Sequence, residues 1–128
     1  MKLLSFGKQK QPADFVFQIE DMFALTTGGA VVAGHVVGGV LRQGEAALCV
    51  SENGNSFPCV IEMIELADPK HRGKFIHPKE VRAEGPEGAR CAVKIPGRSK
   101  SDFVPGDRLV PAGSAASMGG VFLQDQNR

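Results

Sequence analysis

Apolar and polar residues alternate along most of this chain with a period of two, the pattern of β-strands rather than helices. Glycine-rich and asparagine-rich turns, such as those at residues 26–29 and 53–55, separate the alternating segments. Short strands with almost no helical periodicity indicate a closed barrel or a sandwich. Because closure protects strand edges, we predict an all-β, six-stranded antiparallel closed β-barrel. Its strands are expected near residues 15–25, 30–37, 46–50, 57–66, 91–95 and 108–110.

The alternating pattern occupies residues 14–111, which we predict to be the barrel domain. Residues 1–13 are polar and basic and are expected to form a flexible N-terminal arm. Residues 112–128 are small and polar and are expected to be a disordered tail.

Two internal segments differ from simple alternation. Residues 57–66 are apolar on both faces, which favours one central strand. Residues 67–88 are polar and contain three prolines, so we predict a long loop with one helical turn at residues 79–83.

Composition limits the classes of function. The 128 residues suffice for one domain, and 42% of them are apolar, which supports a buried core. Fifteen basic and fourteen acidic side chains give a net charge of +1, which argues against a general nucleic-acid coat but allows a local basic patch. The chain has no apolar run of about 18 residues, so we expect a cytoplasmic monomer without membrane contact.

Three cysteines, Cys49, Cys59 and Cys91, form no C-x-x-C pair. Each lies beside apolar neighbours, so we predict reduced, buried thiols rather than a disulfide framework or a zinc site. No metal or other cofactor is expected.

No segment predicts an active site. Residues 29–34 have the glycine spacing of a phosphate loop, but they have strand character and are followed by His35 instead of lysine. We therefore predict no GTP binding and no enzymatic activity. His35 is interpreted as a packed or surface histidine, and Glu20 and Asp21 should point to opposite faces of their strand unless a bulge redirects one.

The strongest candidate contact surface is a basic cluster in the long polar segment. It could neutralise phosphates or meet an acidic protein, with Phe75 available for stacking; the alternative is a solvated loop. The cluster comprises Lys70, Arg72, Lys74, Phe75, Lys79 and Arg82.

Several motifs in order resemble the β-barrel second domain of the translational GTPases, as in elongation factor Tu. Residues 15–25 read FVFQIEDMFAL, residues 29–36 read GAVVAGHV and residues 39–45 read GVLRQGE. Further matches are VIEM at 60–63, GARCAV at 88–93 and PGDRLV at 105–110. The resemblance covers about residues 14–111, without the GTPase domain, and implies the same barrel fold.

In that family the barrel forms part of the pocket for the aminoacyl end of tRNA. The resemblance places the two acids and the aromatic residue of this pocket at Glu20, Asp21 and Phe23. Half of the pocket chemistry is changed, because the other matching positions hold Ala33, His35 and Arg90.

The resemblance implies, first, a non-enzymatic binding module for RNA, tRNA or the ribosome. A protein–protein adaptor, docking onto a GTPase or another complex, is the second hypothesis. A barrel that senses a small molecule is the third.

Overall fold

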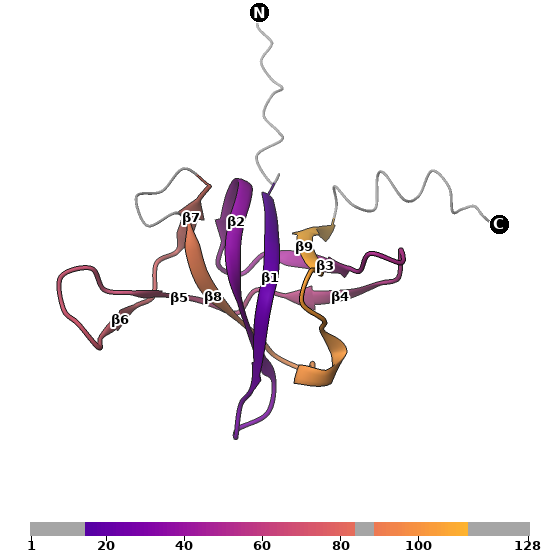
Figure 1. Ribbon diagram of the computed structural model, residues 1–128, viewed down its shortest axis with the longest axis horizontal. Coiled ribbons are helices and arrows are strands. Elements are labelled where there is room, and N and C mark those ends of the chain that lie inside the picture. The colour runs from indigo at the N-terminus through magenta and orange to yellow at the C-terminus, as the bar shows by residue number, and fades with distance from the viewer. Residues whose placement is uncertain (1–14, 84–88, 113–128) are drawn as a thin grey trace, which may run out of the picture.

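The computed structural model describes residues 15–83 and 89–112, and this part of the chain folds as antiparallel β-structure (Figure 1). The predicted N-terminal arm and, apart from Ala112, the predicted C-terminal tail lie outside the described residues. Within the described ranges there are nine strands: β1 (Phe15–Ala24), β2 (Ala30–Arg42), β3 (Ala46–Val50), β4 (Ser56–Val60), β5 (Met63–Ala67), β6 (Phe75–Ile76), β7 (Glu80–Arg82), β8 (Arg90–Ile95) and β9 (Arg108–Pro111).

The strands pair in the order β4-β3-β9-β1-β2-β8-β5-β6, and β7 pairs with β2. β4 is the first strand in this order, and β5 is the last but one. Only Ile61 and Glu62 separate them in the chain, so the backbone crosses directly from one end of the sheet to the strand beside β6. Ile61 remains attached to the start of β3, since its amide donates to the Glu45 carbonyl at 2.9 Å. The predicted all-β antiparallel class is confirmed, although nine strands replace six and no hydrogen-bonded ladder joins β4 to β6.

The segment expected to be one central strand at 57–66 is divided into β4 and β5. Its first half pairs with β3 and its second half with β8, and the backbone must change partners between them. Burial changes from the odd positions Cys59 and Ile61 to the even position Ile64. The sequence pattern does not reveal this change, because apolar residues occupy both faces of the segment.

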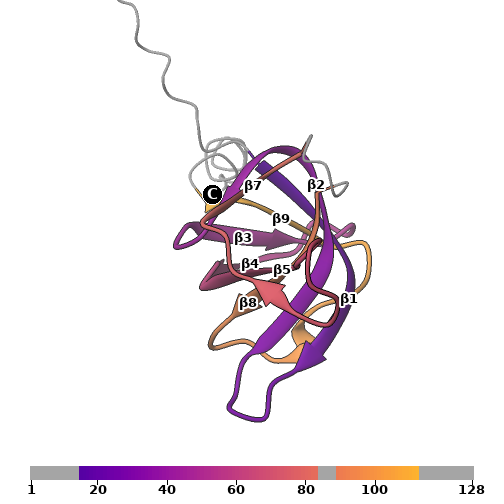
Figure 2. The ribbon, with the colours of Figure 1, turned by 90° about the vertical axis from the view of Figure 1, so that its left-hand side faces the viewer.

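The long polar segment contains regular structure that the sequence pattern did not predict. β6 pairs with β5, and the resulting hairpin extends from one side of the body in Figure 1. β7 replaces the helical turn predicted at residues 79–83, because Glu80–Arg82 pair with Val40–Arg42 of β2. Figure 2, viewed from the β6 side, shows the chain passing from β6 up to β7.

Two β-bulges shape the long β1–β2 ladder. The register steps from Ile19↔Gly34 to Asp21↔Ala33, so Glu20 is an extra residue of β1. At this point the two backbones approach closely, and a Cβ on Gly34 would lie 1.9 Å from the Gln18 carbonyl oxygen. Glycine is therefore required at residue 34 by sterics.

The core lies inside the curved sheet. Its largest fully buried side chains include Phe15, Phe17 and Leu109, which come from β1 and β9. All three cysteines are free and buried, as predicted. Burial raises the pKa of the Cys91 thiol to about 12, so it stays protonated and serves as a small apolar group.

Candidate functional site

The outward side chains of β1, β2, β8 and β5 form a surface that we call the outer face. Residues paired across neighbouring strands share a face of the sheet, so the registers define rows of side chains across it. One row is Phe23–Val31–Lys94–Met63, and the next is Asp21–Ala33–Ala92–Glu65. A third row contains Gln18, His35 and Arg90.

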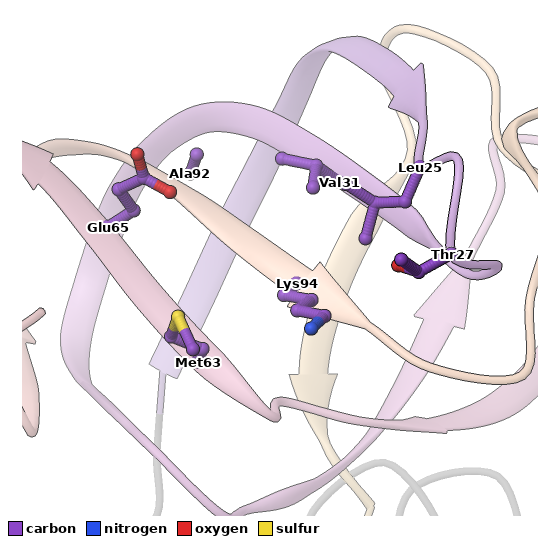
Figure 3. A pocket seen from close by; sticks show the side chains of 7 residues that line it. All are labelled: Leu25, Thr27, Val31, Met63, Glu65, Ala92 and Lys94. Atoms are coloured by element: carbon purple, nitrogen blue, oxygen red, sulfur yellow. The ribbon is translucent and has the colours of Figure 1, made fainter.

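The middle row forms a shallow floor, because Ala33 and Ala92 carry small side chains on adjacent strands. Two pockets, of about 230 and 260 Å³, lie over this floor and share Glu65 and Ala92. Figure 3 shows the first pocket, with Glu65 of β5 beside Ala92 of β8, and with Met63 and Lys94 further along the same two strands. Leu25 and Thr27 line its end near the β1–β2 turn. The second pocket extends to β6.

Three residues that the sequence analysis discussed meet at the β1 bulge: Glu20, His35 and Arg90. The Oε2 atom of Glu20 lies 2.6 Å from Nδ1 of His35, and its Oε1 atom lies 3.2 Å from Nη1 of Arg90. Both carboxylate oxygens are therefore engaged by basic groups. His35, interpreted from sequence as a packed or surface histidine, is half-buried and belongs to this cluster.

Glu20 and Asp21 do not point to opposite faces, because the exception allowed for a bulge applies here. Ile19 is buried and Met22 packs against the core, whereas both acids between them are exposed. The bulge accounts for this, since one extra residue interrupts the inward–outward alternation. The Oδ1 atom of Asp21 accepts a hydrogen bond from the Met22 amide at 2.8 Å. Phe23 is half-exposed in the row of Val31.

The turn between β5 and β6 carries three of the predicted basic residues: Lys70, Arg72 and Lys74. Asp68 organises it, because its carboxylate accepts hydrogen bonds from the Lys70 amide and from the His71 ring, both at 2.9 Å. These hydrogen bonds, the backbone one first, lower the pKa of Asp68. Within the described ranges, the three cations are exposed and form no ion pair. We call residues 68–76 the arm, which is distinct from the predicted N-terminal arm at residues 1–13.

The predicted basic cluster is divided by the fold. Lys79 precedes β7, and Arg82 at its end pairs with Glu80 at 3.1 Å, so these two lie along β2 instead of on the arm. Conversely, the fold brings Phe75 and Arg90, which lie apart in the sequence, to the same pocket. Phe75, 57% exposed at the base of the arm, lines the second pocket together with Arg90.

Sequence reasoning missed Gln18, Glu65 and Lys94 of the outer face, and also Arg108 on β9, which pairs with Gln18. Glu65 forms a distant ion pair with His77, at 4.0 Å, and Lys94 one with Glu62, at 3.9 Å. Alternation within each strand could have placed them outward. Their grouping depends on register across strands, which only the structure supplies.

Residues 29–34, which have phosphate-loop spacing, lead into and lie within β2 instead of forming a strand-to-helix turn. The absence of GTP binding remains a prediction. In the described ranges, no helix has the length and apolar character needed to cross a membrane.

Two solved structures of the translation elongation factor SelB from Methanococcus maripaludis have a similar fold. The apo form matches with a TM-score of 0.60 and the complex with the GTP analogue GppNHp with 0.59, each at 18% sequence identity. Each match covers 78% of this chain but only 19% of the SelB chain. The resemblance to a translation-factor barrel is thus confirmed at the level of fold. No protein-family model and no curated protein matches the chain.

Proposed function

We propose that this protein is a non-enzymatic binding module of the translation apparatus and that its partner is RNA. The observation that carries the proposal is the arm. It presents Lys70, Arg72 and Lys74 to solvent without acidic partners in the described part of the chain, next to the exposed ring of Phe75. Cations neutralise phosphates, and an exposed aromatic ring can stack on an unpaired base.

The order of the arm supports a contact role. A solvated connection needs no internal structure, yet Asp68 fixes the turn by accepting hydrogen bonds from Lys70 and His71. The amide of Asp68 also donates to the Lys74 carbonyl at 2.9 Å, which closes the turn. A fixed turn loses less conformational entropy when it binds, so the cations are pre-organised.

Binding without catalysis agrees with the chemistry of the outer face. Glu20 is the carboxylate closest to a histidine there, but its two oxygens are already held by His35 and Arg90. The amino group of an aminoacyl ester would have to displace these basic groups. We therefore propose that the partner is recognised by its phosphates and bases.

The test measures binding of a fluorescein-labelled oligouridylate at several salt concentrations. Replacing Lys70, Arg72 and Lys74 with alanine should reduce the affinity and lower the slope of log K against log salt by roughly 0.7 for each lost phosphate contact. The melting temperature should not change, because exposed charges contribute little to stability.

The matched comparison uses two double variants that each remove two lysine charges. Lys70→Ala with Lys74→Ala should weaken binding. Lys94→Ala on β8 with Lys100→Ala, an exposed residue of the short 3-10 helix Lys100–Asp102, should leave it nearly unchanged. Equal losses would indicate non-specific attraction. If the parent protein does not bind the oligonucleotide at low salt, the RNA proposal is wrong, and a protein partner becomes the alternative to test.

A further inference from the structure

The third row of the outer face continues beyond the strands that form the pockets. Gln18 pairs with His35 on β2 and with Arg108 on β9, so the sequence-distant Arg90, His35, Gln18 and Arg108 lie in one line across four adjacent strands. At the other end, Arg90 shares the second pocket with Phe75 of β6. We call these five residues the belt.

We propose that the belt is the path of a single RNA strand, which runs from the arm across the sheet to Arg108. This inference rests on the proposed function. It adds the direction in which the RNA strand runs and the length of RNA that is in contact with the protein. Neighbouring strands lie about 4.8 Å apart, so Arg90 and Arg108, three strand steps from each other, are separated by about 14 Å. That spacing accommodates several nucleotides, as in other sheet surfaces that bind single strands.

The side chains of the belt suit a phosphodiester backbone. Arg90 is 65% exposed on the side chain, and Arg108 is exposed and forms no ion pair within the described residues. Gln18 between them offers a neutral amide donor, and Phe75 at the arm end offers a stacking surface. Cations with an intervening amide and one aromatic ring provide backbone tracking with little sequence selectivity.

Three carboxylates lie beside the belt, and one of them, Glu65, lines the second pocket with Phe75 and Arg90. Glu20 lies beside Arg90 and His35, and both of its oxygens are engaged by those residues. Glu52 lies in a pocket with Gln18 and Arg108, at the far end of the belt. The three cations of the arm, with Arg90 and Arg108, give five cations along the path, against the four carboxylates of Glu20, Glu52, Glu65 and Asp68.

Length dependence distinguishes the belt from the arm. Labelled oligouridylates of about four and about twelve nucleotides are compared on the parent and on Arg108→Ala. The variant should bind the long probe several-fold more weakly and should lose roughly 0.7 from its salt slope, because one phosphate contact is removed. It should bind the short probe as the parent does, since the arm suffices for that.

Lys94→Ala is the matched control, because Lys94 is a cation of the same outer face but lies outside the belt. If Arg108→Ala and Lys94→Ala affect the long probe equally, the belt is wrong, although the proposed function stands as long as arm variants weaken binding. A duplex that binds as tightly as the single strand also overturns the proposal. Loss of binding to both probes in Arg108→Ala, at an unchanged melting temperature, would overturn the assignment of the short probe to the arm.

Discussion

The imidazole Nδ1 of His35 lies 2.6 Å from the carboxylate Oε2 of Glu20, fifteen residues earlier in the chain. The contact depends on the bulge in β1, which inserts Glu20 into the ladder without a partner on β2. The same carboxylate reaches Arg90 on β8, so one extra residue connects three strands through their side chains. The outer face therefore carries a charge cluster at the centre of the belt.

Glu20→Gln should strengthen RNA binding. The substitution keeps a side chain of the same shape but removes a negative charge beside the belt, and a charge at about 4 Å in water contributes about 1 kcal/mol, roughly fivefold in affinity at low salt. Binding of the labelled oligouridylate checks this. Glu62→Gln, which removes a charge beside Lys94, is the control and should have a smaller effect. Weaker binding by Glu20→Gln would mean that Glu20 positions Arg90 for its contact.

Gly34→Ala should destabilise the fold by at least about 2 kcal/mol, because the new Cβ would overlap the backbone of β1. The ideal Cβ position lies 1.9 Å from the Gln18 carbonyl oxygen. Gly38→Ala in the same strand is the control, since its Cβ meets no atom within 4 Å. Urea unfolding should show a large decrease in the midpoint for the first variant and almost none for the second. Equal midpoints would contradict the close approach of β1 and β2.

Arg98→Ala should expose the edge of β4. The guanidinium lies 4.1 Å from the centroid of the Phe57 ring and donates two hydrogen bonds, at 3.1 and 3.3 Å, to the Pro58 carbonyl. Losing the cation–π contact should cost about 1 kcal/mol in the free energy of unfolding. Arg98→Lys should restore little of it, because lysine lacks the planar fork. Chemical denaturation measures the free energy of unfolding of both variants. If lysine restores the full stability, the contact depends on positive charge alone and not on the planar guanidinium.

Stability should fall at alkaline pH because of the buried thiols. Burial raises the pKa of Cys91 from 9.0 to about 12, so the folded protein keeps a proton that the unfolded chain has lost in this range. The contribution of Cys91 to the free energy of unfolding should therefore be fully present below about pH 9 and should decline as the pH rises toward 12. Each such thiol contributes a slope of up to about 1.4 kcal/mol per pH unit.

Cys91→Ala provides the comparison for the alkaline decline. Its unfolding free energy should fall less steeply than that of the parent between about pH 9 and pH 11, because one proton no longer takes part. The chain has no tyrosine, which removes the other side chain that commonly titrates in this range when buried. An identical slope in both proteins would show that Cys91 titrates equally in the folded and unfolded states.

The sequence determined the β class, the main turns and the buried thiols, because each follows from local properties. Alternation with a period of two needs only neighbouring residues, and glycine at Gly44 and Gly106 is read from turns that require positive φ, here 89° and 101°. The family resemblance added the fold, which the SelB structures share.

Only the tertiary structure decided which of these residues act together. The bulge at Glu20 reversed the predicted direction of one acid, since a single extra residue changes the inward–outward alternation. Pairing of Glu80–Arg82 with β2 separated Lys79 and Arg82 from the arm, and the partner change at Ile61 divided a continuous apolar run into two strands. The belt exists because register places Arg90 and Arg108 in one row. Register is a relation between strands that are distant in sequence, so no pattern within a single strand specifies it.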